Sequence, residues 1–347
     1  MQRKRGQMKK KTYLAEAIET AGMKAQLDAR AKKIVADKGV LSWIIKYTVE
    51  ELKDYTLEEI AAAIEGIEIA AIPVYPGMVK TEAIVGMATE DAVPNEGKVT
   101  YDIRFCVLLP KGERIKLILN IEIQKDSYSG YDLVTRAVFY CARMISAQLN
   151  TEFNDSNYDD IKKVYSIWLC LNSPKKEADT ITEYHIEPRA LYGSSEARQR
   201  YDLMSIVMVK LNEESWQTKE TLLHGFLGTI FSKELKAEEK LNILEHDYEV
   251  EITREVKEGV NIMCNLSDAI EERGIQQGIQ QGMQQGGEQK LIEQICRKVR
   301  KGKTLQIIAE ELEEEESSVS KIYDTVLASA PDYDCGKVYA LLHNDNE

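Results

Sequence analysis

The sequence predicts an α/β fold whose core elements follow the order α-β-β-β-α-β. Two neighbouring segments, Thr100–Leu109 and Ile115–Gln124, are filled with β-branched and aliphatic residues and are joined by a short turn that contains proline and glycine. This pattern is typical of two paired strands. Helical spacing of apolar residues comes before and after the pair, and the apolar run Val164–Leu171 then predicts a buried strand.

Composition places the chain among globular proteins of two or three domains. It has 347 residues, of which 44% are hydrophobic and 30% are charged. No run reaches the length of a membrane span, and the basic start Met1–Arg5 has no apolar segment behind it. We therefore expect a cytoplasmic protein without a membrane partner. The six cysteines lack the spacing of a zinc site or a disulfide framework, and the four histidines are far apart.

Three helices are expected before the central strands. Apolar and charged residues mix at helical spacing in Ala15–Lys38, and Leu41–Leu52 suits a second helix. Thr56, with Glu59 three residues later, forms the pattern of a capping box at the start of a third helix. One face of that helix would hold Ile60, Ile64 and Ile67. A first strand is then expected near Lys80–Ala88.

The two central strands carry carboxylates on a polar stripe. Alternation places Asp102 and Arg104 on one face of the first strand, and Tyr101, Ile103 and Phe105 on the other. The polar face of the second strand holds Asn120, Glu122 and Gln124. Two neighbouring carboxylates repel each other and resist burial, and a divalent cation such as Mg²⁺ removes both penalties. The alternative is a sheet with one solvated face, on which these residues are surface groups.

Further candidates for the site lie on both sides of the two strands. Before them, Glu82 and Glu90 would add a carboxylate, or would be exposed as most glutamates are. After them, a helical pattern places Arg136 and Tyr140 on one face at i, i+4 spacing. Arg136 would hold a phosphate group there with Tyr140 behind it, or it would pair with Asp132 on a solvated helix face.

Several short motifs resemble a known family. The matching stretches are Val99–Phe105, Asn120–Gln124, Gly130–Cys141 with its Arg136 and Tyr140, Lys163–Trp168, and Met263–Ser267. Over roughly Leu41 to Leu342 the chain resembles the bacterial PD-(D/E)XK nuclease family transposases, which are related to the recombination-promoting nucleases. The resemblance implies a restriction-endonuclease-like core. It also implies Mg²⁺-dependent hydrolysis of DNA phosphodiester bonds, with Mn²⁺ as a substitute ion.

The resemblance also assigns roles to residues of the polar stripe. The family's two metal-binding carboxylates fall on Asp102 and Glu122, with the backbone carbonyl of Ile123 as a third ligand. Gln124 stands at the position of the superfamily's lysine, where this branch commonly has glutamine. A neutral amide can orient a water molecule but cannot supply positive charge to the transition state. The candidates for that charge are Arg136, Arg104 and, if the strand ends before it, Lys125.

Charge is the main objection to a DNA partner. The net charge is −13, and affinity for nucleic acid depends on neutralising phosphates. Basic clusters nevertheless occur within residues 3–11 and 297–303, while much of the acidity lies in Glu310–Glu316. The competing interpretation is a catalytically weak nuclease remnant that acts as an oligomeric DNA-binding or protein-interaction module.

The C-terminal region contains a repeat and a small helical unit. Gly274–Gly286 has a glycine at every fourth position, which indicates either a flexible linker or a helix through which copies of the chain form a homo-oligomer. The residues from Leu291 resemble a helix-turn-helix with Thr304 as an N-cap, but glutamates replace its small turn residue. That replacement indicates a degenerate or protein-binding unit. The predicted domains are a basic tail with the first helix (1–40), a nuclease-like core (41–190), a helical subdomain (191–272), the repeat (273–290) and the C-terminal unit (291–347).

Overall fold

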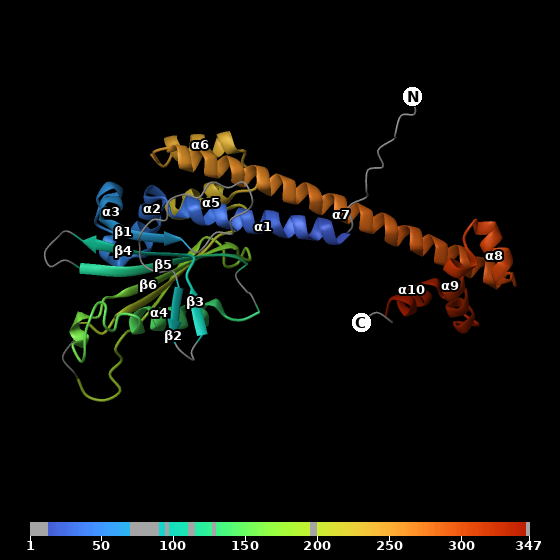
Figure 1. The fold of residues 1–347 in the computed structure, drawn as a ribbon, viewed down its shortest axis with the longest axis horizontal. Helices are drawn as coiled ribbons and strands as arrows, with labels where there is room; N and C mark the ends of the chain where they lie inside the picture. Colours follow the sequence, from blue (N-terminus) through green and yellow to red (C-terminus); the bar gives the residue numbers. More distant parts are fainter. Residues whose placement is uncertain are drawn as a thin grey trace, which may run out of the picture. The chain divides into compact units, whose positions relative to one another are not determined.

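The described chain forms two compact units. A computed structural model describes residues 13–69, 90–93, 97–109, 115–126, 130–194 and 200–344. The first unit is Met1–Ile270 and the second is Glu271–Glu347. Within the described ranges, the first unit combines helices with a six-stranded sheet, and the second is helical (Figure 1). The first unit is therefore α/β, as the sequence predicts.

Helices and strands follow one another along the described chain. The described α-helices are α1 (Tyr13–Val35), α2 (Lys38–Thr48), α3 (Leu57–Ala63), α4 (Leu133–Ser146), α5 (Leu222–Phe231), α6 (Ala237–His246), α7 (Arg254–Arg300), α8 (Leu305–Leu312), α9 (Glu316–Ala328) and α10 (Cys335–Asn344). Short 3₁₀ turns are η1 (Glu50–Leu52), η2 (Tyr158–Asp160) and η3 (Ser215–Gln217). The strands are β1 (Ile64–Ile69), β2 (Glu90–Val93), β3 (Gly97–Thr100), β4 (Ile103–Leu109), β5 (Ile115–Asp126), β6 (Val164–Asn172), β7 (Thr180–His185) and β8 (Met204–Lys210).

The main sheet is mixed, with strand order β1-β4-β5-β6-β8-β7. The strands β1, β4 and β5 are antiparallel, β5, β6 and β8 are parallel, and β7 is antiparallel to β8. Parallel neighbours need a crossover connection, and α4 lies in the chain between β5 and β6. The strands β2 and β3 form a separate two-stranded hairpin.

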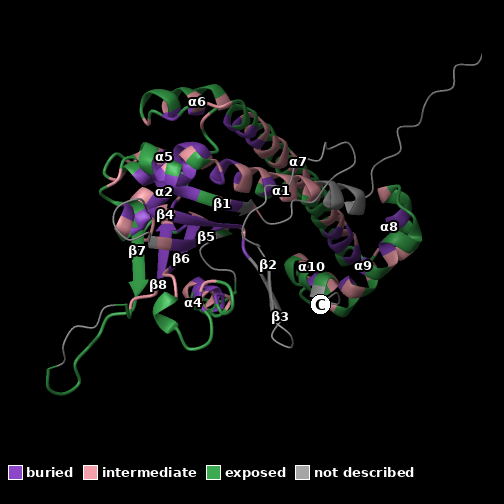
Figure 2. Ribbon diagram, turned by 60° about the vertical axis from the view of Figure 1, so that its left-hand side comes forward, coloured by how far each residue is buried: buried purple, intermediate pink, exposed green. Residues whose placement is uncertain are grey.

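Both faces of the sheet are covered, so its central strands are buried (Figure 2). On one face, Phe105 and Ile121 belong to a large apolar core together with residues of α1, α2, α3 and α5. On the other face, α4 packs on β6 and β8, with Cys141 and Met144 in one cluster with Trp168. Polar residues on the α4 side of β5 therefore lie in the interior.

The third helix is shorter than the sequence predicts. The capping box is confirmed, because Thr56 Oγ1 accepts from the Glu59 N–H at 3.2 Å while the Thr56 N–H donates to Glu59 Oε2 at 2.9 Å. The expectation that Ile64 and Ile67 continue the helix face is wrong, since both belong to β1. Gly66 has a φ of +63°, which a right-handed helix excludes, and β-branched isoleucines favour a strand.

The first central strand is also shorter than expected. Thr100 ends β3, and β4 begins at Ile103. Tyr101 packs in the cluster under α4 and not with Ile103 and Phe105, so its expected place on their face is wrong. The chain leaves regular strand geometry at Tyr101 and Asp102, and alternation does not carry across that break. The strand expected near Lys80–Ala88 lies outside the described residues.

The second unit has its own apolar core. Residues of α7, α8, α9 and α10 share it, among them Ile295, Ile308, Val319 and Val338. The repeat at 274–286 lies within α7, so the linker interpretation is wrong. None of the described helices is both long enough and apolar enough to cross a membrane.

The turn between α8 and α9 forms although its residues are acidic. Thr304 is the N-cap of α8, as expected. Glu313 follows the helix in the left-handed conformation, with a φ of +57°, and glycine is the residue that adopts this conformation most easily. Helix, turn and helix therefore follow one another here as in a helix-turn-helix, but the turn residues are negatively charged.

Candidate functional site

The pairing of β4 with β5 brings Asp102 and Glu122 together. The register aligns Ile103 with Ile121, and Asp102 comes immediately before β4. Beyond this pair of residues, the two segments are joined by side-chain hydrogen bonds and no longer by the backbone hydrogen bonds of the sheet. The Asp102 N–H donates to Glu122 Oε1 at 3.1 Å, and the Ile123 N–H donates to Asp102 Oδ2 at 3.0 Å. These reciprocal bonds hold both carboxylates in place on neighbouring strands.

Asn120 adds a buried amide to the pair. Its side chain is fully buried, and its Nδ2 donates to Glu122 Oε1 at 3.0 Å. Within the described part of the chain, nothing donates a hydrogen bond to Asn120 Oδ1. Leaving a buried acceptor without a donor is costly. A bound ion or water molecule is the kind of partner that would satisfy this oxygen.

Burial makes Glu122 a weak acid. The residue is 1% exposed, and this loss of solvation raises its pKa more than any other influence. The Asp102 carboxylate raises it further, whereas the Asp102 N–H, the Arg136 charge and the Asn120 amide lower it. The net effect raises the pKa of Glu122 to about 8. Burial therefore favours the protonated form of Glu122 when no cation is bound.

Gln124 and Lys125 follow the carboxylates along β5. Gln124 is partly buried and shares the strand face of Asn120 and Glu122 by alternation. Lys125 is exposed, and β5 continues past it to Asp126. The strand does not end before Lys125, so this side chain keeps the opposite face from Gln124.

Arg136 is held by aromatic residues on the α4 side of the sheet. Its Nε and Nη2 donate to the Tyr140 hydroxyl at 3.0 and 2.5 Å, and its Nη1 donates to the Tyr131 hydroxyl at 2.9 Å. The guanidinium carbon lies 5.0 Å from the Tyr140 ring centre and 5.3 Å from that of Trp168. Asp132 caps the first turn of α4 instead of pairing with Arg136.

The remaining candidates lie in different places. Arg104 is buried on β4, opposite Asn120 in the register, with its guanidinium 5.2 Å from the Tyr101 ring centre. Glu90 begins β2, which pairs with β3 apart from the six-stranded sheet. Glu82 lies outside the described residues.

Sequence reasoning misses Lys32, which lies beside Asp102. Its ammonium nitrogen is 2.7 Å from Asp102 Oδ1 and 2.8 Å from Asp28 Oδ2. Burial alone would lower the pKa of Lys32, but the charges and hydrogen bonds of these two carboxylates raise it. The spacing of Asp28 and Lys32 in one helix is the only local signal, and it does not point to a strand far along the chain. We refer to Lys32, Asp102, Asn120 and Glu122 as the carboxylate site.

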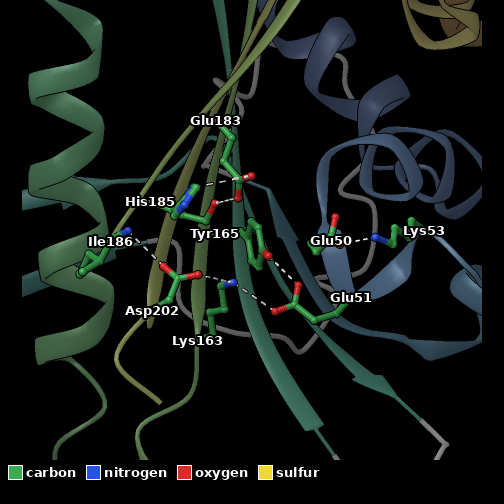
Figure 3. A network of polar contacts seen from close by, with 10 residues as sticks. Glu50, Glu51, Lys53, Lys163, Tyr165, Glu183, His185, Ile186 and Asp202 are labelled. Atoms are coloured by element: carbon green, nitrogen blue, oxygen red, sulfur yellow. Dashed lines mark hydrogen bonds and ion pairs between the residues drawn. The ribbon is translucent and has the colours of Figure 1, made fainter. Parts of the chain in front are cut away.

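A second polar cluster ties the same sheet to η1. Figure 3 shows Lys163 between Glu51 and Asp202, with its nitrogen 3.2 and 3.0 Å from their carboxylate oxygens. The Tyr165 hydroxyl donates to Glu51 at 2.5 Å, and Asp202 accepts a bond from the Ile186 N–H at 3.2 Å. We refer to Glu51, Lys163, Tyr165 and Asp202 as the Lys163 cluster.

The carboxylate site offers oxygen donors to a hard cation. In the described ranges, no group of three or more His, Cys, Asp or Glu side chains has the arrangement of a metal site. The carboxylate site instead combines two carboxylates with an amide oxygen that lacks a donor. Oxygen donors of this kind suit Mg²⁺ and Mn²⁺, which keep bound waters for chemistry.

Comparisons with known proteins give no family for this chain. It matches no protein-family model, no curated protein and no solved structure. What the chain does must therefore follow from the residues and geometry of the carboxylate site.

Proposed function

We propose that this chain is a Mg²⁺-dependent DNA endonuclease of the PD-(D/E)XK type, similar to the transposases and recombination-promoting nucleases of that superfamily. The observation that carries the proposal is the close pair of Asp102 and Glu122: the Asp102 N–H donates to the Glu122 carboxylate, and the Asp102 carboxylate accepts from the Ile123 N–H. Lys32 contacts Asp102, while the ionised form of the buried Glu122 is disfavoured by desolvation and by the Asp102 charge, so a divalent cation bound to both carboxylates would remove that cost. The Asn120 oxygen without a donor supports a ligand at the same place.

The order of elements supports the same class. If the β2–β3 hairpin is set apart, the main-sheet strands around α4 occur as β1, β4, β5, α4 and β6, after the N-terminal helices. This is the α-β-β-β-α-β order that the resemblance implies. In that order, Asp102 precedes the second strand and Glu122 lies on the third.

The mechanism assigns a task to each residue of the site. Asp102, Glu122 and the Ile123 carbonyl would hold Mg²⁺, which when bound lowers the pKa of a water molecule and polarises a phosphoryl oxygen. Gln124 would orient the attacking water, and Arg136 would offset charge on the phosphate. Hydrolysis adds water across one P–O ester bond, which leaves a phosphate monoester and a hydroxyl group.

Two tyrosines prepare Arg136 for an anion. The Tyr131 and Tyr140 hydroxyls accept its hydrogen bonds, so its planar fork is held in one orientation before a ligand arrives. Because hydroxyls are neutral, the guanidinium keeps its full positive charge. A preorganised arginine loses less side-chain entropy when it binds a phosphate.

The basic cluster at 297–303 contributes less to DNA binding than its composition suggests. Lys298 and Lys303 both pair with Glu311. Arg300 donates to the backbone carbonyls of Asp332 and Tyr333. These three basic side chains are therefore already bonded to groups of the protein itself. The other basic cluster, within residues 3–11, lies outside the described residues.

Metal binding and plasmid nicking test the proposal. Titration calorimetry with Mn²⁺ should show one binding event for the wild-type protein and none for Asp102→Ala. Wild-type protein should nick a supercoiled plasmid when Mg²⁺ is present, and Glu122→Ala should lose at least about 100-fold of that rate. Equal metal binding by wild type and Asp102→Ala would remove the proposed site.

The second candidate is the catalytically weak remnant that binds DNA or proteins as an oligomer. It is favoured by the apolar residues of the α7 repeat, since Ile275, Ile279 and Met283 are 57%, 58% and 74% exposed. Wild-type protein that binds DNA yet nicks none, over a range of salt and with Mn²⁺, would assign the chain to this class.

A further inference from the structure

Lys32 lies in the carboxylate site although it comes from the first helix of the chain. Its pair with Asp102 is shielded, because the two side chains are only 15% and 16% exposed. Asp28, its other partner, is 52% exposed. Ion pairs that are shielded from water are less weakened by solvent and salt than exposed pairs. Asp102 is therefore the principal partner of Lys32.

Core packing fixes the backbone that carries Lys32. Ala31, Ile34 and Val35 of the same helix are buried in the large core of the first unit. The α7 residue Gly259 lies so close to α1 that a Cβ there would come within 2.8 Å of Ile34. The helix α1 therefore cannot rotate or slide without losing these contacts. The fold itself holds the Lys32 ammonium beside the carboxylates.

The other polar residues leave a place for a second cation beside Arg136, whose charge also acts on Glu122. Gln124 carries no charge. Arg136 directs its nitrogens to the hydroxyls of Tyr131 and Tyr140. Lys32, by contrast, contacts a carboxylate of the site directly.

We propose that the Lys32 ammonium has two roles in the carboxylate site. It competes with a divalent metal ion for Asp102, and it supplies to a bound phosphate the positive charge that Gln124 lacks. Both parts rest on the metal site of the proposed function, and only the second also rests on nuclease activity. A lysine ammonium is a compact charge with three donors on a flexible stem. It can exchange one anionic partner for a nearby one while α1 stays in place.

Metal affinity tests the first part. Lys32→Met removes the charge but keeps an unbranched apolar stem, and we expect it to bind Mn²⁺ about tenfold more tightly than wild type in titration calorimetry. Lys32→Arg keeps the charge and should stay within about twofold of wild type. The matched control is Lys33→Met, because Lys33 makes no ion pair with any described acidic residue. Unchanged or weaker Mn²⁺ binding by Lys32→Met, in protein that circular dichroism shows to be folded, would overturn the proposal.

Plasmid nicking at saturating Mn²⁺ tests the second part. Lys32→Met should nick about 30-fold more slowly than wild type even though its metal site is full, because charge near the phosphate is missing. Adding Gln124→Lys to that variant should restore at least about tenfold of the rate. Nicking by Lys32→Met at the wild-type rate would contradict the proposal.

The two measurements separate this inference from the proposed function. If wild-type protein binds Mn²⁺ but nicks no DNA, the nuclease function fails, and the Mn²⁺ affinity of Lys32→Met still decides the competition at Asp102. Tighter binding would support the place of Lys32 in the metal site, and unchanged binding would overturn it.

Discussion

The carboxylate site and the Lys163 cluster lie on the same sheet and each contain two carboxylates, but the neighbours of those carboxylates differ. In the Lys163 cluster, Glu51 and Asp202 both contact the ammonium of Lys163. In the carboxylate site, the ammonium of Lys32 contacts Asp102. Glu122 instead accepts from the neutral Asn120 amide and the Asp102 N–H, and the Asp102 carboxylate raises its pKa.

This difference separates a cluster in which one cation contacts both carboxylates from one in which the two carboxylates have different partners. In the Lys163 cluster, the lysine lies between Glu51 and Asp202 and balances the charge of both, and the Tyr165 hydroxyl donates a further bond to Glu51. In the carboxylate site the pKa of Glu122 is instead raised to about 8, and Asn120 Oδ1 has no hydrogen-bond donor among the described residues. Buried polar groups that lack a hydrogen-bond partner or have a strongly shifted pKa cost stability, and in proteins such groups cluster at functional sites.

The largest expected effect is on stability as a function of pH. Because the folded-state pKa of Glu122 is raised to about 8 from 4.5, metal-free protein should lose stability as pH rises between these values, when the unfolded chain ionises first. Glu122→Gln removes this loss. In urea unfolding with EDTA present, the free energy of unfolding of Glu122→Gln relative to wild type should therefore increase by about 3 kcal/mol from pH 5 to pH 8. Parallel pH curves for the two proteins would mean that Glu122 is not held as described.

A smaller effect is expected from the Lys163 cluster. Lys163→Met leaves Glu51 and Asp202 without their shared cation, and we expect it to lower the free energy of unfolding by about 2 kcal/mol at pH 7. Mn²⁺ affinity should not change. The control is Lys175→Met, whose pair with Glu214 is exposed and should cost less than about 0.5 kcal/mol. A loss of metal binding in Lys163→Met would show that the two clusters are coupled.

The smallest effect concerns the neutral amide of the carboxylate site. Gln124→Lys alone should raise the rate of plasmid nicking about threefold to tenfold, because Lys32 already provides part of the positive charge. Rates measured at several salt concentrations would separate this local effect from a general gain in DNA affinity. A drop in rate would indicate that the amide, as a water-orienting group, matters more than charge at this position.

Local patterns predict much of the frame of the site. The alternation of polar and apolar residues predicts the pairing of β4 with β5, and Asp102, immediately before β4, meets Glu122 of β5 at the end of that pairing. The i, i+4 spacing of Arg136 and Tyr140 predicts their contact on α4. In each case the residues that interact are neighbours in one element or in two elements joined by a short connection.

Local sequence patterns do not predict features that depend on contacts between distant residues or on the backbone angles of a single residue. Isoleucines at Ile60, Ile64 and Ile67 fit helical spacing, and the positive φ of Gly66 is what assigns the later two to a strand. Lys32 reaches Asp102 only because α1 packs on the core beside the sheet. Nothing near Lys32 in the sequence distinguishes it from an exposed lysine.

The glycines of α7 make one stretch of that helix easier to open than the rest. A Cβ at Gly274, Gly278, Gly282 or Gly286 would meet no atom within 4 Å, so alanine would fit at each position. Each glycine costs a helix about 1 kcal/mol relative to alanine, or roughly 4 kcal/mol over the four. We therefore expect local unfolding of α7 to be easier in the repeat than in the turns that pack on a core.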